Sequence, residues 1–407
     1  MARRGFKNID WGLLIAILAL TAVGLALVYT ASRVPAYPWK SALFGRQMMW
    51  LAMGGVTLIL AMAIPFRFWE EYSQFFYIGG LVLLVAVLVV GAEREGARRW
   101  LVVGGLQFQP AEIAKLATIV FLARMLARPR IDLRRLGTVA PVVGVGLLPF
   151  ALILVEPDLG TSLSLPVAMI PMLFWAGFPL SALFLLVSPL LSVLLSWNLW
   201  VWLGFVAVVA ALLFAIRAKR AVVVAVVALN MAAGAGAPIL WNSLKPYQQE
   251  RVLTFLNPEK DPADAGYQVI QSKIALGSGG WAGKGYLQGT QKGLAFLPEQ
   301  HTDFIFAVLG EEFGFLGCVG VLLLFVLLIQ RGLAVAVKAR SRFAGLMAVG
   351  ICGMILFHVA VNVSMTLGLA PVTGLPLPFL SYGGTFLLVT LAQCGLLLNV
   401  SLRRNEF

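Results

Sequence analysis

Charged residues are scarce in this chain of 407 residues, in which Asp, Glu, Lys and Arg together make up 12%. Cysteine is scarcer still, and Cys318, Cys352 and Cys394 all fall inside apolar runs. That placement argues against a disulfide framework or a thiolate metal site and is typical of small core residues. The sequence also lacks GxSxG, HExxH, P-loop and CxxC patterns. Serine hydrolysis, zinc hydrolysis and nucleotide hydrolysis therefore have no support.

Apolar runs make up most of what is present. Hydrophobic residues account for 60% of the chain, and the runs are long enough to cross a hydrocarbon core of roughly 30 Å. Segments that cross lipid form helices or a closed barrel, and these runs lack the alternation of barrel strands. The sequence predicts an all-α polytopic membrane protein, with one transmembrane domain over 1–407. We expect spans at 11–31, 48–65, 73–91, 110–127, 138–155, 161–177, 180–196, 199–216, 221–241, 302–329, 343–367 and 383–402.

The basic residues favour one side of this predicted bundle. If the N-terminus is inside, the inner segments are rich in Lys and Arg, for example around 128–135 and 338–342, whereas the outer segments mix both signs. That asymmetry follows the positive-inside rule. It also accounts for the net charge of +13 without nucleic acid, because basic inner loops lie beside an anionic leaflet. Twelve spans place both termini on the cytoplasmic side and a large loop, 242–301, outside.

A polar, glycine-rich segment follows the ninth predicted span. Residues 257–317 hold an unusual share of the ionisable side chains, namely Asp261, Asp264, Glu299, His301 and Asp303. Carboxylates on one side of a membrane protein allow general base chemistry, in which a positioned Asp takes a proton from an attacking hydroxyl. The segment therefore predicts catalysis or recognition, and the residues by themselves leave open which carboxylate acts.

The sequence GAEREGARRWLVVGGLQFQPAEIAK lies between the third and fourth spans. Pro110 fits the first turn of a helix, so Glu112 and Lys115 would share a helix face at or in the membrane. They form either a structural ion pair or the lining of a polar cavity. Arg98 and Arg99 lie just outside, either as an interfacial pair or as a guanidinium clamp for phosphate.

Two further motifs connect apolar spans. In EPDLGTS, residues 156–162, Asp158 is placed to cap the following helix. The segment LAPVTGLPLPFLSYGGT, 369–385, has a density of proline and glycine that predicts a non-helical loop, buried in protein or lining a cavity. His358, alone on an apolar helix, is interpreted as a core residue rather than a ligand.

These motifs together resemble one family. The blocks FQPAEIAK, EPDLGTS, DPADAGYQVIQSKIALGSGGWAGKG with GTQ, LPEQHTDFIFAVLGEEFG and LPLPFLSYGG resemble, in this order, the SEDS (shape, elongation, division and sporulation) family. The match is interrupted only around 178–240. The resemblance implies a SEDS-type transmembrane helix bundle, usually of ten spans, against the twelve expected here. It is closer to the elongation (RodA-like) branch than to the division (FtsW-like) branch.

The resemblance also implies an activity. It predicts a peptidoglycan glycosyltransferase that polymerises lipid II on the outer face of the bacterial cytoplasmic (inner) membrane, in cell-wall biogenesis and cell shape. The expected partners are a class B penicillin-binding protein, which is the cross-linking transpeptidase, and other proteins of the elongation complex. Undecaprenyl pyrophosphate would leave as the acceptor hydroxyl displaces it with inversion.

Residue roles carry over by motif. Asp261 would be the general base, Arg99 and Lys115 would offset the charge of the leaving pyrophosphate, and Glu112 would pair with Lys115. The substrate-binding set implied by the blocks is Arg99, Glu112, Lys115, Asp158, His301 and Ser381. No cofactor is specified. A divalent cation, Mg²⁺ or Mn²⁺, would suit a pyrophosphate leaving group, with Asp264 as a candidate ligand.

Three alternative functions are compatible with parts of this pattern. A lipid II flippase would also use charged cavities and Gly-Pro loops, although the carboxylates lie on one side and no inverted repeat is visible. A division polymerase of the FtsW-like branch differs in only a few loop residues. A scaffold that only recruits the transpeptidase predicts that Asp261→Asn leaves polymer synthesis intact.

Overall fold

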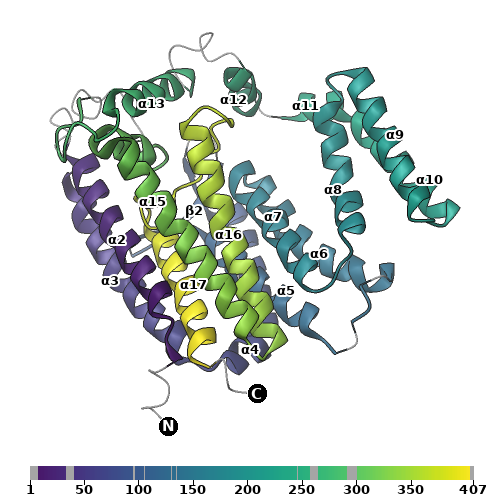
Figure 1. Cartoon of the computed structure of the whole chain (residues 1–407), viewed down its shortest axis with the longest axis horizontal. Coiled ribbons are helices and arrows are strands. Elements are labelled where there is room, and N and C mark those ends of the chain that lie inside the picture. Colours follow the sequence, from purple (N-terminus) through teal and green to yellow (C-terminus); the bar gives the residue numbers. More distant parts are fainter. Residues whose placement is uncertain are drawn as a thin grey trace.

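The computed structural model describes residues 8–33, 41–94, 97–104, 106–129, 131–133, 135–244, 246–256, 265–290 and 300–403. Within these ranges the chain forms a bundle of helices, as predicted (Figure 1). A helix coincides with each of the predicted spans. They are α2 (Trp11–Ser32), α3 (Ala42–Ala63), α4 (Phe66–Val90), α5 (Pro110–Ala127), α6 (Leu136–Val155), α7 (Leu159–Trp175), α8 (Leu180–Leu195), α9 (Leu199–Ala215), α10 (Arg220–Ala235), α15 (Ile305–Lys338), α16 (Arg342–Thr366) and α17 (Gly384–Leu402).

Not all of these helices are equally suited to cross a membrane. In the described part of the chain, seven are long and apolar enough, or eight if α10 and the short α11 (Ala237–Ser243), which meet at a bend of 46°, form one span. The helices α7, α8 and α9 are apolar but have only 17, 16 and 17 residues. Helix α5 is less apolar because it carries Glu112, Lys115 and Arg124. The chain is thus a multi-pass membrane protein.

The core of the bundle is built around the two last helices. Of the 18 most apolar consecutive residues, 72% are buried within the protein in α16 and 83% in α17, against 22% in α3. Helix α17 packs against α3, and α16 packs against α5, α7 and α15. Side chains of α3 and α4 that face outward are large and apolar, as expected where lipid rather than water is the solvent.

Helices α8, α9 and α10 form a separate layer at the side of the bundle (Figure 1). The predicted break at the basic turn is confirmed, because α9 ends at Ala215 and α10 begins at Arg220. Buried polar side chains join α8 to α10. The Ser192 hydroxyl donates to Asn230 Oδ1 at 2.8 Å, and Asn230 Nδ2 donates to Ser188 Oγ at 2.9 Å.

A small antiparallel sheet between α4 and α5 was not predicted. Strands β1 (Ala92–Arg94), β2 (Ala97–Val103) and β3 (Leu106–Phe108) pair in the order β1-β2-β3. The sequence predicted only that this stretch lies between two spans, and strands as short as the three residues of β1 and β3 show no alternating pattern. The sheet holds Arg99 in β2 and leads directly into α5 at Pro110.

The large predicted loop, 242–301, contains more helix than expected. Helix α12 (Pro246–Leu256) and helix α13 (Ala265–Gly279) lie beyond the bundle, at the end opposite to the N- and C-termini (Figure 1). Helix α13 packs against α15. The predicted span 302–329 also differs, since the helix runs from Ile305 to Lys338 and is broken at Gly314, where φ is 64° and ψ is −163°.

Candidate functional site

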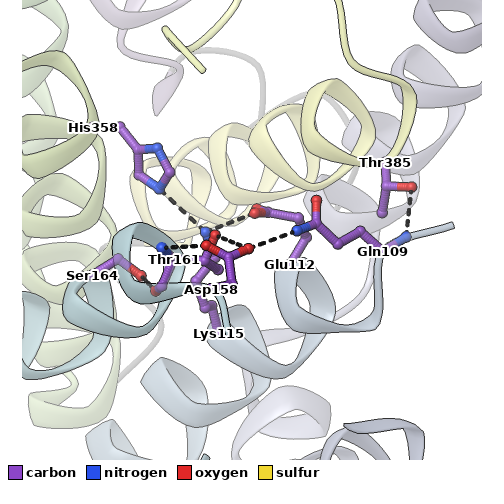
Figure 2. A network of polar contacts seen from close by, with 8 residues as sticks. All are labelled: Gln109, Glu112, Lys115, Asp158, Thr161, Ser164, His358 and Thr385. Carbon is purple, nitrogen blue, oxygen red and sulfur yellow. Dashed lines mark hydrogen bonds and ion pairs between the residues drawn. The ribbon is translucent and has the colours of Figure 1, made fainter. Parts of the chain in front are cut away.

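Asp158 begins α7 at the turn that joins α6 and α7. Its Oδ1 accepts a hydrogen bond from the Thr161 amide at 3.1 Å, and its Oδ2 accepts one from the Thr161 hydroxyl at 2.9 Å. The predicted helix cap is therefore confirmed. Gln109 Nε2, from the residue that precedes α5, lies 3.4 Å from Oδ2 (Figure 2). The cap thus also connects the start of α7 with the start of α5.

Of the two alternatives for Glu112 and Lys115, an ion pair or the lining of a polar cavity, the structure shows the ion pair. Lys115 Nζ lies 2.8 Å from Glu112 Oε1, and the two side chains are only 1% and 4% exposed. The same ammonium lies 3.2 Å from His358 Nε2 on α16 (Figure 2). Since Lys has no acceptor, it donates to this ring nitrogen. Loss of either charge would leave the other buried and uncompensated, which typically costs about 3–5 kcal/mol.

A further contact joins this network to α17. The Gln109 amide donates to Thr385 Oγ1 at 3.2 Å, and the Thr385 hydroxyl lies 3.4 Å from the Gln107 carbonyl. Thr385 belongs to the proline- and glycine-rich segment 369–385, which is largely buried and non-helical up to α17, as predicted. Elements far apart in the sequence, α5, α7, α16 and α17, therefore meet at one polar network inside the bundle (Figure 2).

Arg99 lies at the mouth of a cleft beside this network. Its side chain donates from Nε to the Glu156 carbonyl at 3.2 Å and from Nη2 to the Pro157 carbonyl, so it is fastened to the α6–α7 turn. The cleft is lined by the turn, α12 and the segment after α16, with residues Arg99, Pro157, Asp158, Leu159, Gly160, Leu244, Gln248, Arg251, Val252, Pro371, Val372 and Thr373. Two guanidinium groups and one carboxylate make it a cationic cleft suited to an anion.

Glu156 lies directly behind this cleft, in the turn after α6. It is 1% exposed, and neither carboxylate oxygen has a hydrogen-bond partner within the described residues. Burial, with the neighbouring charge of Asp158, raises the pKa of the Glu156 carboxyl to about 8, although Arg99 opposes the shift. At neutral pH this carboxyl therefore carries a proton for much of the time.

His301 and Ser381 lie in a second cluster, which is not part of the lining of the cleft. The Ser381 hydroxyl donates to the Thr302 carbonyl at 2.6 Å and accepts from the Leu377 amide at 2.8 Å. The His301 carbonyl accepts from the Tyr382 amide at 2.8 Å, and the two rings lie 5.7 Å apart. In this arrangement Ser381 fastens the Gly-Pro segment to the turn before α15. The structure brings together Arg99, Glu112, Lys115 and Asp158, whereas His301 and Ser381 belong to this neighbouring cluster.

Asp261, the predicted base, and Asp264 lie outside the described residues, as does Glu299. The chain on either side of Asp261 is described. Helix α12 ends at Leu256 and helix α13 begins at Ala265, so both flank the segment that carries it. Among the described residues no group of three or more His, Cys, Asp or Glu could hold a metal ion.

Several residues of the site were not predicted. His358 is buried, as expected of a core residue, but its contact with Lys115 spans 243 positions of the sequence. Arg251 and Thr385 were missed for the same reason. Glu156 did carry a signal, since it is an acidic residue at the end of an apolar span, where an ionised carboxylate is costly.

The fold and this site define a polytopic helical membrane protein with a buried ion pair and a cationic cleft at one end of its bundle. Comparison with known proteins assigns the family. The family model described as a cell cycle protein, that of FtsW, RodA and SpoVE, matches residues 11–205 and 186–406. The chain belongs to this family, which is the SEDS family that the motifs resemble.

Two relatives match over almost their whole length. The chain is 37% identical to peptidoglycan glycosyltransferase MrdB of Escherichia coli K12, over 98% of this chain and 94% of that protein. It is 36% identical to peptidoglycan glycosyltransferase RodA of Treponema pallidum, over 99% of this chain and 100% of that protein. A probable peptidoglycan glycosyltransferase FtsW of Trichlorobacter lovleyi is 34% identical.

Solved structures share the fold. One chain from the structure described as "Structural coordination of polymerization and crosslinking by a peptidoglycan synthase complex" is 35% identical, with a TM-score of 0.74 over 98% of this chain and 99% of that chain. The rod shape determining protein RodA of Thermus thermophilus is 29% identical, with a TM-score of 0.63 over 97% of both chains.

Proposed function

We propose that this protein is a peptidoglycan glycosyltransferase that polymerises lipid II. The observation that carries the proposal is the cationic cleft, with Arg99 and Arg251, at the end of the bundle that carries α12 and α13. Full-length relatives named as peptidoglycan glycosyltransferases support the reaction class. An enzyme of this class needs a site for a pyrophosphate and a base for a sugar hydroxyl. The cleft offers two guanidinium groups for the first, and the sequence between α12 and α13 contains Asp261 for the second.

Asp261 would supply the base. The 4-hydroxyl of the acceptor GlcNAc attacks C1 of the donor MurNAc, and the hydroxyl proton passes to the Asp261 carboxylate. The bond between C1 and the phosphate oxygen breaks, and undecaprenyl pyrophosphate takes the electron pair. An α-linked donor gives a β-1,4 product in one inverting displacement.

Arg99 and Arg251 would offset the charge that builds up on the leaving pyrophosphate. A guanidinium matches a phosphate in a bidentate fashion. Lys115, which the family resemblance also assigned to this charge, is buried in its pair with Glu112 and is absent from the lining of the cleft. In this structure Lys115 instead connects α5 to α16 through its contact with His358.

The membrane orientation and the partner follow from the same proposal. Both termini would be cytoplasmic, and the cleft would open on the outer face of the bacterial inner membrane. A class B penicillin-binding protein would cross-link the new strands, in keeping with the coordinated polymerisation and crosslinking that is named for the related complex. The slightly higher identity to RodA and MrdB than to FtsW supports a role in cell elongation.

Glycan synthesis from lipid II by the purified protein, in complex with its penicillin-binding partner, tests the proposal. Moenomycin is added to silence contaminating polymerases of the other class. We expect glycan chains from the wild type and a loss of about 10²–10⁴-fold in Asp261→Asn, the usual contribution of a general base. The control Asp132→Asn removes an exposed carboxylate from the turn between α5 and α6 and should retain activity.

Each of the other outcomes contradicts part of the proposal. Equal synthesis by wild type and Asp261→Asn would exclude Asp261 as the base and favour a scaffold. No glycan from the wild type, in a complex shown to be intact, would contradict the transferase and favour the flippase.

A further inference from the structure

A second pocket lies next to the cationic cleft, on the other side of Arg251. It is formed by α12, α13 and the segment after α16, with residues Arg251, Thr254, Phe255, Val269, Lys273, Gly368, Ala370, Pro371 and Val372. The cleft and this pocket share Arg251, Pro371 and Val372, so they are neighbours with a common wall. The second pocket contains Lys273 where the cleft contains Arg99.

The described lining of this pocket carries two cationic side chains. Arg251 and Lys273 line it, and none of its described lining residues is Asp or Glu. Hydrogen bonds to its last carbonyls hold the end of α16 in place beside the pocket. The Gly368 amide donates to Met365, the Leu369 amide donates to Ser364, and the Ser272 hydroxyl donates to Thr366 at 2.6 Å.

Local packing sets the position of Lys273. The Ser272 contact fixes this turn of α13 against the end of α16. Gly368 has a φ of +70°, and a Cβ atom at this position would lie 2.3 Å from Lys273 Cε and 2.6 Å from its Nζ. The absence of a side chain at Gly368 therefore leaves the space through which the ammonium reaches the pocket.

The ligand that fits this pocket is a phosphate or pyrophosphate with an apolar or sugar substituent. Arg251 can bind phosphate oxygens in a bidentate manner, and Lys273 adds a compact charge. The remaining walls, among them Phe255, Val269 and Pro371, are apolar. A pocket of this kind beside a first phosphate site is useful to an enzyme that joins two substrates which both carry a pyrophosphate.

We propose that the pocket between α12 and α13 binds the pyrophosphate of the second lipid-linked substrate, the acceptor. Arg251 is shared with the cleft and separates the two anionic groups. This inference rests on the proposed function for the identity of the two substrates. The pocket itself, with its two cations, does not depend on it. Arg251 and Lys273 are binding residues for this subsite, and Lys273 is specific to it.

Binding stoichiometry tests the subsite directly. Farnesyl pyrophosphate, a short soluble probe, is titrated into the purified full-length protein, and the bound molecules are counted by native mass spectrometry. We expect two molecules for the wild type and one for Lys273→Gln. Lys273→Arg, which keeps the charge, should again bind two. Arg340→Gln removes a cation that follows the far end of α15 and should also bind two.

Glycan synthesis gives the second readout. Lys273→Gln should raise the KM for lipid II by about tenfold, the equivalent of about 1.4 kcal/mol, while Arg340→Gln leaves it unchanged. Two molecules bound to Lys273→Gln, or one to the wild type, would overturn the inference. So would displacement of the second molecule by phosphatidylglycerol at equal concentration, because the pocket would then be a phospholipid headgroup site.

The two proposals fail in different ways. If the wild type makes no glycan, the glycosyltransferase is contradicted, and the stoichiometry still decides whether the pocket binds a pyrophosphate. If the wild type makes glycan and Lys273→Gln shows neither the lost binding nor the raised KM, the subsite alone is contradicted.

Discussion

Among single residues, Glu156 lies in an unfavourable environment for a charge. Its carboxyl is buried between α6 and α7, close to the carboxylate of Asp158, and Arg99 is the cation near it among the described residues. Protonation relieves both the desolvation and the repulsion. The turn that positions Arg99 and Asp158 at the cleft should therefore be most stable when Glu156 is neutral.

The stability of the protein should fall as the pH rises because of this residue. Burial raises the pKa of Glu156 to about 8 in the folded protein, against the usual 4.5 of a glutamate, so the folded state binds more protons between these two pH values. The stability that Glu156 contributes is fully present below pH 4.5, and it is lost as the pH rises through the folded-state pKa of about 8. The slope is at most about 1.4 kcal/mol per pH unit for one proton.

The comparison of wild type with Glu156→Gln in detergent measures this effect. The apparent melting temperature of the wild type should fall relative to the variant between pH 5 and pH 8.5, because Gln resembles the neutral acid. Parallel curves for the two proteins would contradict the raised pKa.

The features of the site that the sequence predicted are those that depend on residues close to one another in the sequence. The Glu112–Lys115 pair and the Asp158 cap both depend on a spacing of three residues, which a helix imposes wherever it lies. His358, Thr385 and Arg251 come from distant helices. Their approach to the site depends on how the helices pack, and no local spacing encodes that.

At the scale of elements, the break in α15 is the feature on which the end of the bundle depends. A helix interrupted at Gly314 leaves the carbonyls of Glu311 and Glu312 and the amides of Phe315 and Leu316 without their usual partners. The turn after α13 supplies hydrogen-bond partners for all four of these backbone groups. Lys284 and Gly285 donate to the carbonyls at 3.0 and 3.1 Å, and the amides donate to Gly280 and Trp281 at 2.9 and 3.1 Å.

A side chain contact reinforces this exchange. Lys284 Nζ lies 2.8 Å from Glu311 Oε1, and the same oxygen accepts from the Thr290 amide at 2.7 Å. The motif GSGGWAGKG therefore serves to complete a broken helix. The sequence analysis identified its glycines as part of a functional loop but could not predict this pairing, because the break in α15 has no proline to mark it.

Substitution of Gly283 should loosen this junction. Gly283 has a φ of +80°, and a Cβ atom would lie 2.1 Å from the Glu312 carbonyl oxygen. Gly283→Ala should therefore destabilise the protein by at least about 1–2 kcal/mol, the cost of the left-handed conformation alone. Gly277→Ala is the matched control, since a Cβ atom there meets nothing within 4 Å and the residue is helical. It should be neutral or stabilise by roughly 0.5–1 kcal/mol.

Thermal unfolding in detergent, with limited proteolysis of the α13–α15 connection, distinguishes these variants. Faster cleavage in Gly283→Ala than in Gly277→Ala is expected. Equal stability and equal cleavage of both would mean that the turn does not hold the break in place.

At the scale of the whole molecule, the two ends of the bundle differ in chemistry. The end that carries α12 and α13 has the cationic cleft and the second pocket, whereas both chain termini lie at the other end (Figure 1). Helix α15 connects the two. Its 34 residues run from the α13 side to the basic turn Lys338–Arg342, and the unbroken part after Gly314 has 24 residues, about 36 Å at 1.5 Å per residue. A span of this length crosses a hydrocarbon core of roughly 30 Å with an excess on each side.

Single cysteines at the two ends report which face is outside. The native Cys318, Cys352 and Cys394 are 9%, 2% and 0% exposed, so they should react slowly with a polar maleimide. In spheroplasts, a membrane-impermeant maleimide should label Lys273→Cys directly. It should label Arg340→Cys only after the membrane is permeabilised, because the basic turn between α15 and α16 is expected inside.

The reverse pattern would place the cleft in the cytoplasm, where a polymerase of extracytoplasmic glycan could not work, and would contradict the proposed function even if the fold stands. Labelling of both positions without permeabilisation would mean that the spheroplasts leak, which the wild-type protein and a soluble cytoplasmic marker reveal in the same experiment.

Charge distribution alone predicted this orientation, because positive side chains are counted segment by segment and need no knowledge of packing. The three helices α8 to α10 add one further constraint. Whether an odd or an even number of them crosses the membrane decides on which side Lys273 lies, so the same labelling tests that parity.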